Sequence, residues 1–364
     1  MANKTINFNN PVELNDIPLL VSTIGHHRSV MLRGEPGIGK STVLKMLEKM
    51  HGDKYDYIYV DCPVMDVSDI VMRIPNHQSK TLESYVSELF KLDSPKPKFI
   101  MFDEITKAPK LLQVIFTRAM LEGYVGDVDM RGKYPGTTFF ATGNNVTDGV
   151  GDAMSAHVIN RLCVVNVRKP NHAKWNVWAT DSGVSGLLRA FVAMNTKCLA
   201  SYLDGGQEEN EFIFHPARPT VSFVSPRSLV GADEVIKNRD KLGSYVTQAA
   251  LAGLCGAAFA EKIEAFLKME KELIAVKDIL KDPDNVQIPE KPAVLFQIMF
   301  NAVDSIETQD DLSAFMKFVK RIRSEEIQEC FYTMAFNTKR TAKLAKNNND
   351  LREWGMKNIE LLMP

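Results

Sequence analysis

The sequence predicts an α/β fold with a mostly parallel five-stranded sheet, followed by two helical regions. Three observations support this prediction. Short β-branched runs alternate with helical patterns in the first half of the chain, a glycine-rich motif separates the first strand from the first helix, and strand patterns are rare in the second half. The 364 residues are enough for two or three packed units, and we expect them at 1–170, 171–280 and 281–364.

Strands are predicted where β-branched and other apolar residues follow one another, as is typical of strands buried on both faces of a parallel sheet. The predicted strands cover 29–34, 55–61, 98–104, 137–145 and 163–169. Apolar residues at helical spacing predict helices over 41–50 and 110–123. Ligands of such sheets bind beyond the carboxyl ends of the strands, so we expect a site in the segments that follow them.

The second half of the chain is predicted to be helical. Residues 174–203 are expected to form two helices that separate near Gly183, and residues 246–276 a further helical stretch. Residues 204–228 contain three prolines and indicate loops, and residues 282–292 indicate a linker. The helical patterns after this linker predict a small all-α region.

Composition excludes several classes of protein. The net charge of −1 provides no overall basic field for nucleic acid. The polar first residues do not resemble a signal peptide, and the most apolar stretch, 246–260, is too short to cross a bilayer. The five cysteines, an odd number without C-x-x-C spacing, indicate reduced thiols. We therefore expect a cytoplasmic protein that does not enter a membrane.

Residues 34–41, GEPGIGKS, match G-x-x-x-x-G-K-[ST], which binds phosphates when it lies between a strand and a helix. Its glycines let successive backbone N–H groups point at one anion, and the following helix adds its positive end. We predict that Lys40 reaches the β- and γ-phosphates of a nucleotide and that Ser41 helps to hold Mg²⁺. The alternative is a glycine-rich turn that matches by chance, which the strand and helix on either side disfavour. The predicted nucleotide contacts are Gly34, Glu35, Pro36, Gly37, Ile38, Gly39, Lys40, Ser41 and Thr42.

Polar residues end two further predicted strands. We predict that Asp103 holds Mg²⁺ through its water shell and that Glu104 orients and activates the attacking water. The alternative, a strand that ends in two solvated acids, is disfavoured by the phosphate motif upstream. The Asn144 amide could bond the γ-phosphate or the water, although an Asn-Asn turn is equally compatible with these residues alone.

These motifs, in this order, resemble the AAA+ ATPases, and most closely their MoxR-like branch, whose members occur in phages and bacteria. The resemblance covers most of residues 28–260 and is carried by GEPGIGKS, FIMFDEITKAP, AMLEGYV, FFATGNN, INRL and SPRSL. It implies a P-loop AAA+ core with a helical lid, and a Mg²⁺-dependent ATP hydrolase that works as a ring, most often a hexamer. Residues 63–73 resemble the insert region of helix 2 in this branch.

The resemblance also assigns roles to individual residues. Asn144 matches the sensor that positions water, and Arg227 in SPRSL matches a second sensor on the lid of the same subunit. The alternative for Arg227 is a loop arginine at a helix start that Ser225 caps. Arg161 in INRL matches the arginine finger, which acts on the nucleotide of the neighbouring subunit. The alternative for Arg161 is a local ion pair with Asp152.

The resemblance implies chaperone-like remodelling or activation of a protein partner, often a separate protein with a von Willebrand A-type domain. It also implies an inserted hairpin over 126–139. Around this hairpin, at 124–135, Tyr124, Arg131, Lys133 and Tyr134 could grip a peptide or a nucleic-acid backbone, although a solvated turn is equally compatible with them.

Two other functions stay open at this point. One is a nucleic-acid motor or loader, for which the basic stretch 320–346 would be the contact surface, although such stretches are usually solvated faces. The other is a nucleotide-gated binding module with little hydrolysis, against which the presence of Glu104 argues.

Overall fold

The computed structural model describes residues 11–144, 154, 156–218 and 220–362. The chain divides into two compact units. The first comprises Met1–Lys169 and His215–Pro219, and the second comprises Pro170–Phe214 and Thr220–Pro364. The expected division of the second part into a lid over 171–280 and a C-terminal region over 281–364 stays a prediction.

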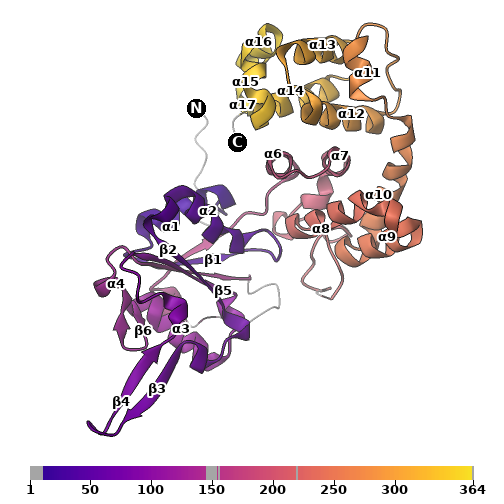
Figure 1. Ribbon diagram of the computed structural model, residues 1–364. Helices are drawn as coiled ribbons and strands as arrows, with labels where there is room; N and C mark the ends of the chain where they lie inside the picture. Colours follow the sequence, from indigo (N-terminus) through magenta and orange to yellow (C-terminus); the bar gives the residue numbers. More distant parts are fainter. Residues whose placement is uncertain (1–10, 145–153, 155, 219, 363–364) are drawn as a thin grey trace. The chain divides into compact units, whose positions relative to one another are not determined.

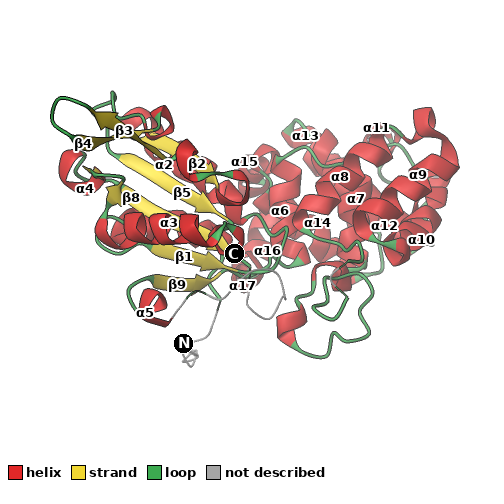
Figure 2. Cartoon of the chain, turned by 90° about the horizontal axis from the view of Figure 1, so that it is seen from below, coloured by secondary structure: helices red, strands yellow, loops and turns green. Residues whose placement is uncertain are grey.

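The first unit contains a five-stranded parallel sheet in the order β2-β5-β8-β1-β9 (Figure 2). Its strands are β1 (Val30–Arg33), β2 (Asp56–Asp61), β5 (Lys98–Asp103), β8 (Thr138–Gly143) and β9 (Cys163–Asn166). The predicted five-stranded parallel sheet is therefore confirmed. Because the strands are parallel, their carboxyl ends lie at one edge, where the phosphate motif, Asp103 and Asn144 follow three neighbouring strands.

Helices cover both faces of this sheet (Figure 1). Helices α1 (Ile17–Ile24) and α2 (Val43–His51) pack on the face formed by alternate strand residues such as Leu32 and Met101. Helix α3 (Lys110–Glu122) packs on the opposite face, which includes Phe102. Each large apolar side chain buried in these layers contributes about 1.5–3 kcal/mol, so the layers hold the carboxyl edge in place.

A second, two-stranded sheet projects from this unit (Figure 1). It is an antiparallel hairpin of β3 (Val71–Asn76) and β4 (Thr81–Val86). The Asn76 side chain accepts hydrogen bonds from two backbone N–H groups of the turn, which closes the hairpin. Met72 and Tyr85, which pair across it, are about half exposed. We did not predict these strands: residues 63–73 were expected only to belong to an insert.

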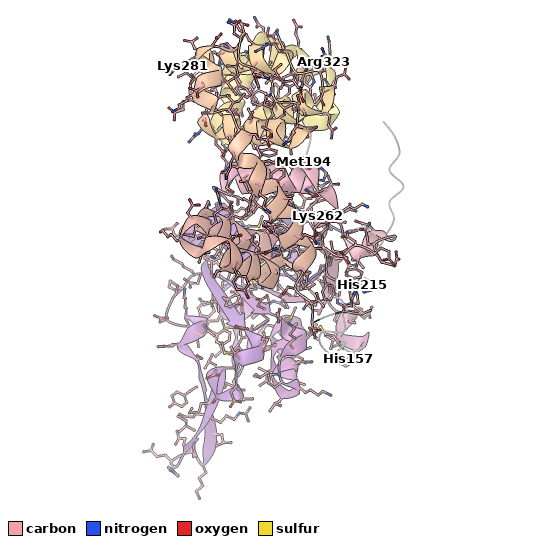
Figure 3. All side chains as sticks on the ribbon, turned by 90° about the vertical axis from the view of Figure 1, so that its right-hand side faces the viewer. His157, Met194, His215, Lys262, Lys281 and Arg323 are labelled. Atoms are coloured by element: carbon pink, nitrogen blue, oxygen red, sulfur yellow. The ribbon has the colours of Figure 1, made fainter. Side chains whose placement is uncertain are left out.

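The hairpin expected over 126–139 is much shorter than predicted. Strands β6 (Tyr124–Val125) and β7 (Val128–Asp129) have two residues each. A helical turn, α4 (Met130–Lys133), follows directly because the Asp129 carboxylate accepts a hydrogen bond from Gly132 N–H and caps it. Helix α5 (Ala156–Ile159), which carries His157, precedes β9 (Figure 3).

In the part of the second unit that the structure describes, helices are joined by turns and loops, without strands. Its helices are α6 (His172–Asp181), α7 (Gly186–Met194), α8 (Pro226–Lys237), α9 (Arg239–Cys255), α10 (Ala257–Lys268), α11 (Val276–Lys281), α12 (Pro292–Ser305), α13 (Gln309–Lys320), α14 (Glu325–Asn337), α15 (Lys339–Asn347), α16 (Asn349–Lys357) and α17 (Ile359–Leu362). Gly183 separates α6 from α7, as expected, with a positive φ of 75°.

One continuous apolar core joins these helices, with α12 packed between α7 and α14. On its surface the Lys262 ammonium of α10 lies 4.6 Å from the centre of the Phe212 ring (Figure 3). All five cysteines of the chain are free thiols, and burial raises the pKa of Cys255 to about 11. Among the described residues, no helix is long and apolar enough to cross a membrane.

Candidate nucleotide-binding site

The phosphate loop follows β1 and leads into α2, as the motif predicts. Gly37 and Gly39 have φ values of 75° and 101°, which residues with a side chain rarely adopt. A Cβ atom on Gly34 would lie 2.7 Å from Ile38 and 2.9 Å from the Val167 carbonyl oxygen, so only glycine fits there. A short 3₁₀ turn, Lys40–Thr42, connects the loop to the helix, and the Thr42 hydroxyl donates to the Gly39 carbonyl.

Lys40 lies at the centre of the site. Its ammonium is buried and donates hydrogen bonds to the carbonyl oxygens of Gly34 and Glu35, at 2.8 and 2.9 Å. It also donates to the amide oxygen of Asn144, at 3.1 Å. Two residues that are 104 positions apart in the sequence therefore lie within hydrogen-bond distance, and they come from neighbouring strands.

Asp103 accepts hydrogen bonds from three hydroxyl groups. The Ser41 hydroxyl donates to its Oδ2 atom at 2.8 Å, and the Tyr59 phenol donates to the same oxygen at 2.8 Å. The Thr142 hydroxyl donates to Oδ1. Thr142 in turn accepts a hydrogen bond from the Glu104 N–H group, at 3.0 Å. The carboxylate is thus held from the start of α2, from β2 and from β8.

Glu104 follows Asp103 in a left-handed backbone conformation, with a φ of 52°. For a residue with a side chain this conformation costs of the order of 1 kcal/mol, and such positions concentrate at functional sites. Its carboxylate is partly exposed and pairs with the Lys107 ammonium at 2.5 Å. The turn therefore presents the carboxylate outside the buried strand, where solvent reaches it.

Glu35 places a negative charge inside the phosphate loop. Its carboxylate is buried and lies 3.7 Å from the equally buried ammonium of Lys169, which ends the first segment of this unit. A buried carboxylate without a cation would be costly and would repel phosphates. Lys169 therefore compensates the charge of the loop, which we did not predict from the sequence.

Arg161 lies between α5 and β9 with its side chain exposed. Its backbone carbonyl accepts a hydrogen bond from the Arg28 guanidinium at 3.1 Å. The Arg161 guanidinium itself makes no hydrogen bond or ion pair to any residue that the structure describes. The alternative partner, Asp152, lies outside the described residues.

Arg227 is an exposed residue in the first turn of α8, in the second unit. The Ser225 side chain caps this helix by accepting a hydrogen bond from Ser228 N–H at 3.1 Å, as the alternative interpretation expected. The assignment of Arg227 as a second sensor stays a prediction, because Arg227 belongs to the second unit and the phosphate loop belongs to the first.

The residues expected to grip a partner do not form an exposed hairpin. The Arg131 guanidinium points inward and donates hydrogen bonds to the Ser29 hydroxyl and the Met120 carbonyl. Tyr134 is buried, and its phenol donates to the Leu92 carbonyl. The gripping hypothesis is therefore wrong for these two residues: both side chains stabilise the fold.

The residues at this edge fit a nucleotide and a magnesium ion. The loop offers backbone N–H groups at glycines with positive φ, and Lys40 offers a buried cation. Ser41 and Asp103 lie 2.8 Å apart and provide the hydroxyl and carboxylate oxygens that Mg²⁺ takes as direct or water-mediated ligands.

Sequence reasoning missed Tyr59, Thr142 and Lys169. Strand alternation contained the signal for the first two. Asp61 pairs with Asp103 in the sheet, so Tyr59 lies on the same face two residues earlier, and Thr142 follows Ala141, which pairs with Phe102. Lys169 could not be found in this way, because it lies beyond the last strand.

Comparisons with known proteins agree with this site. Residues 29–162 match the AAA domain of the dynein-related subfamily. No curated protein matches the chain significantly.

Solved structures match only at low similarity. A protein of Cytophaga hutchinsonii proposed to be an ATPase is 16% identical, with 75% of this chain and 89% of that chain covered and a TM-score of 0.32. The Thermotoga maritima RuvB Holliday junction branch migration motor is 15% identical, with coverage of 77% and 80% and a TM-score of 0.34. Brucella abortus NtrX in complex with ATP is 12% identical, with coverage of 96% and 68% and a TM-score of 0.35. These values are too low to add to the argument.

The identification depends instead on the sequence match and on the site. The match spans the segment from the residue before β1 to the residue before β9. Within it, the phosphate loop, Asp103, Glu104 and Asn144 meet at the carboxyl edge of a parallel sheet. Residues 29–162 therefore form an AAA domain, the nucleotide-binding domain of AAA+ ATPases.

Proposed function

We propose that the protein is a Mg²⁺-dependent ATP hydrolase of the MoxR-like type, which works in the cytoplasm as a ring of six subunits. We further propose that it remodels or activates a separate protein partner in a chaperone-like way. One observation carries the enzymatic part of this proposal. Lys40, Ser41, Asp103, Glu104 and Asn144, from three neighbouring strands, meet at one edge of the sheet.

Binding depends on the loop and on Lys40. The backbone N–H groups and the positive end of α2 attract phosphate oxygens. Lys40 and Asn144, 3.1 Å apart, would exchange their mutual hydrogen bond for contacts to the γ-phosphate. Bound magnesium would supply charge neutralisation for the phosphates, and Ser41 and Asp103 are the residues that would hold it.

Hydrolysis needs a base near a water molecule. The carboxylate of Glu104 is partly exposed, and it would orient the attacking water and accept its proton. Charge then spreads over the γ-phosphoryl oxygens, and an arginine close to them is worth a factor of about 10³–10⁵ in rate. We propose that Arg161 provides this charge to the next subunit and that Arg227 contacts the phosphates of its own subunit.

Two substitutions test the enzymatic proposal. Lys40→Ala should abolish binding of a fluorescent ATP analogue, because the buried cation of the site is lost. Glu104→Gln should keep binding and lower turnover by about 10²–10⁴-fold, which is the typical contribution of a general base. Lys45→Ala, an exposed lysine of α2, is the matched control and should behave as the wild type. Equal turnover of Glu104→Gln and the wild type would favour the binding-module alternative.

The structure provides little support for a nucleic-acid motor. The basic stretch 320–346 is not one helix but includes the end of α13, α14 and α15. Several of its cations are engaged within the second unit: Lys320 pairs with Asp350 at 2.6 Å, and Lys339 pairs with Asp181 at 2.6 Å. We therefore do not propose this function.

A further inference from the structure

Tyr59 is a partner of Asp103 that the phosphate motif and the acidic strand end do not account for. It lies on β2, one of the two edge strands of the sheet, and 43% of its surface is exposed. An exposed phenol can bond to water at no cost, yet its hydroxyl is directed at a carboxylate that is only 6% exposed. The phenol donates this hydrogen bond to Asp103 Oδ2 at 2.8 Å.

The hydrogen bonds to Asp103 leave it little freedom. A carboxylate has about four acceptor positions, and three are occupied by the hydroxyls of Ser41, Tyr59 and Thr142. Two of these donors, Ser41 and Tyr59, share the Oδ2 atom. Through the remaining acceptor position, Asp103 would accept a hydrogen bond from a metal-bound water.

We propose that Tyr59 is a positioning residue for magnesium: its phenol holds the Asp103 carboxylate in the orientation that binds the ion. This inference depends on the proposed ATP-binding function. Side chains that orient a metal ligand from outside typically contribute a factor of 10–100 to metal affinity. Because the Tyr59 phenol donates its hydrogen bond to Asp103, its removal should weaken magnesium binding and leave the contacts between the phosphate loop and the nucleotide unchanged.

The same strand provides a matched control. Tyr57 lies two residues before Tyr59 on the same face of β2, and its phenol donates to the Gly52 carbonyl at 2.8 Å, away from Asp103. Tyr57→Phe and Tyr59→Phe therefore remove the same atom from the same strand. Only the second variant removes a hydrogen bond to the carboxylate.

The experiment titrates Mg²⁺ into the full chain and measures binding of a fluorescent ATP analogue by fluorescence anisotropy. For Tyr59→Phe, the Mg²⁺ concentration at half-maximal binding should rise by about tenfold relative to the wild type. Binding in EDTA should be unchanged in that variant, and Tyr57→Phe should match the wild type throughout. A second measurement, which is independent of turnover, titrates Mn²⁺ into the nucleotide-bound protein and follows the electron paramagnetic resonance signal of the free ion. In Tyr59→Phe, binding of Mn²⁺ should likewise shift to a higher metal concentration.

Three results would overturn the proposal. A Mg²⁺ titration of Tyr59→Phe that coincides with the wild type would show that the phenol does not orient the carboxylate. Equal shifts in both tyrosine variants, or loss of binding in EDTA for Tyr59→Phe, would show that the strand requires the phenol for its structure. Failure of the wild type to bind the nucleotide would instead contradict the proposed function, so the two failures are distinguishable.

Discussion

At the scale of single residues, Thr142 connects the two acidic residues of the site, Asp103 and Glu104. Its buried hydroxyl donates to Asp103 and accepts from the backbone N–H group of Glu104. One hydroxyl therefore fixes both the proposed metal ligand and the backbone of the proposed base. The left-handed conformation of Glu104 is maintained next to this contact.

Thr142→Val should lower turnover and stability together. Valine has the shape of threonine but leaves a buried acceptor and a backbone N–H group without their partner, at a cost of about 1–3 kcal/mol. Thr142→Ser keeps the hydroxyl and should retain turnover. The measurements are ATP turnover and thermal unfolding by circular dichroism. Turnover of the valine variant equal to that of the serine variant would show that the hydroxyl is dispensable.

Sequence motifs predict the residues that would contact a ligand. They predict less well the neighbouring residues whose hydrogen bonds orient those contacts. Lys40, Asp103 and Asn144 could be predicted as candidates because a nucleotide would impose their types and spacing. Tyr59 and Thr142 belong to no such pattern, since a tyrosine or a threonine in a strand is normally explained by strand propensity alone. Only the register between neighbouring strands places their hydroxyls on Asp103.

At the scale of elements, a buried arginine joins two helices of the second unit. The Arg189 side chain of α7 is fully buried, and it pairs with Asp304 of α12. Its guanidinium also donates to the Thr180 hydroxyl at 2.6 Å and to the Val184 carbonyl at 3.0 Å. The ion pair is asymmetric, because the Asp304 side chain is 45% exposed.

Because the two side chains differ in exposure, their substitutions should lower the free energy of unfolding by different amounts. Asp304→Ala leaves a fully buried cation with one partner fewer and should destabilise the unit by about 3 kcal/mol. Arg189→Met fills the space with an apolar chain and leaves a carboxylate that water reaches, so it should cost less. The three tryptophans, Trp175, Trp178 and Trp354, all lie in the second unit. Their fluorescence during urea unfolding reports on it alone, and the reverse order of costs would contradict the argument.

Strands that are buried in the apolar core could be predicted from the sequence, whereas the exposed strands could not. The strands of the central sheet follow from continuous apolar runs that helices cover on both faces. The β3–β4 hairpin has exposed side chains on its strands, so periodic burial could not reveal it. The polar turn at Asn76–Lys80 between two strand-forming runs was the one local signal.

At the scale of the whole molecule, the two units contain different residues of the proposed catalytic machinery. The first contains the nucleotide site and Arg161, and the second contains Arg227. The sequence predicts this order of α/β and helical parts from the change of periodicity after residue 172. It cannot predict how the units act on one another, because that depends on bound nucleotide and on neighbouring subunits.

The exposed charge of Arg161 would find its role in an assembly of subunits. Its charge is exposed, without an ion pair to any described residue, and Arg28 holds the backbone beside it. In a ring each subunit would present this arginine to the nucleotide of the next, as a head-to-tail interface requires. The proposed active site is therefore complete only where two subunits meet.

The central claim, a site shared between subunits, is tested most directly by mixing two inactive variants. Arg161→Ala keeps a site that binds ATP, and Lys40→Ala keeps the arginine, so each alone should hydrolyse almost nothing. In an equal, random mixture about a quarter of the interfaces combine an intact site with an intact arginine, and ATP hydrolysis should return to that extent. Turnover of the mixture no higher than the sum of its parts would contradict the account.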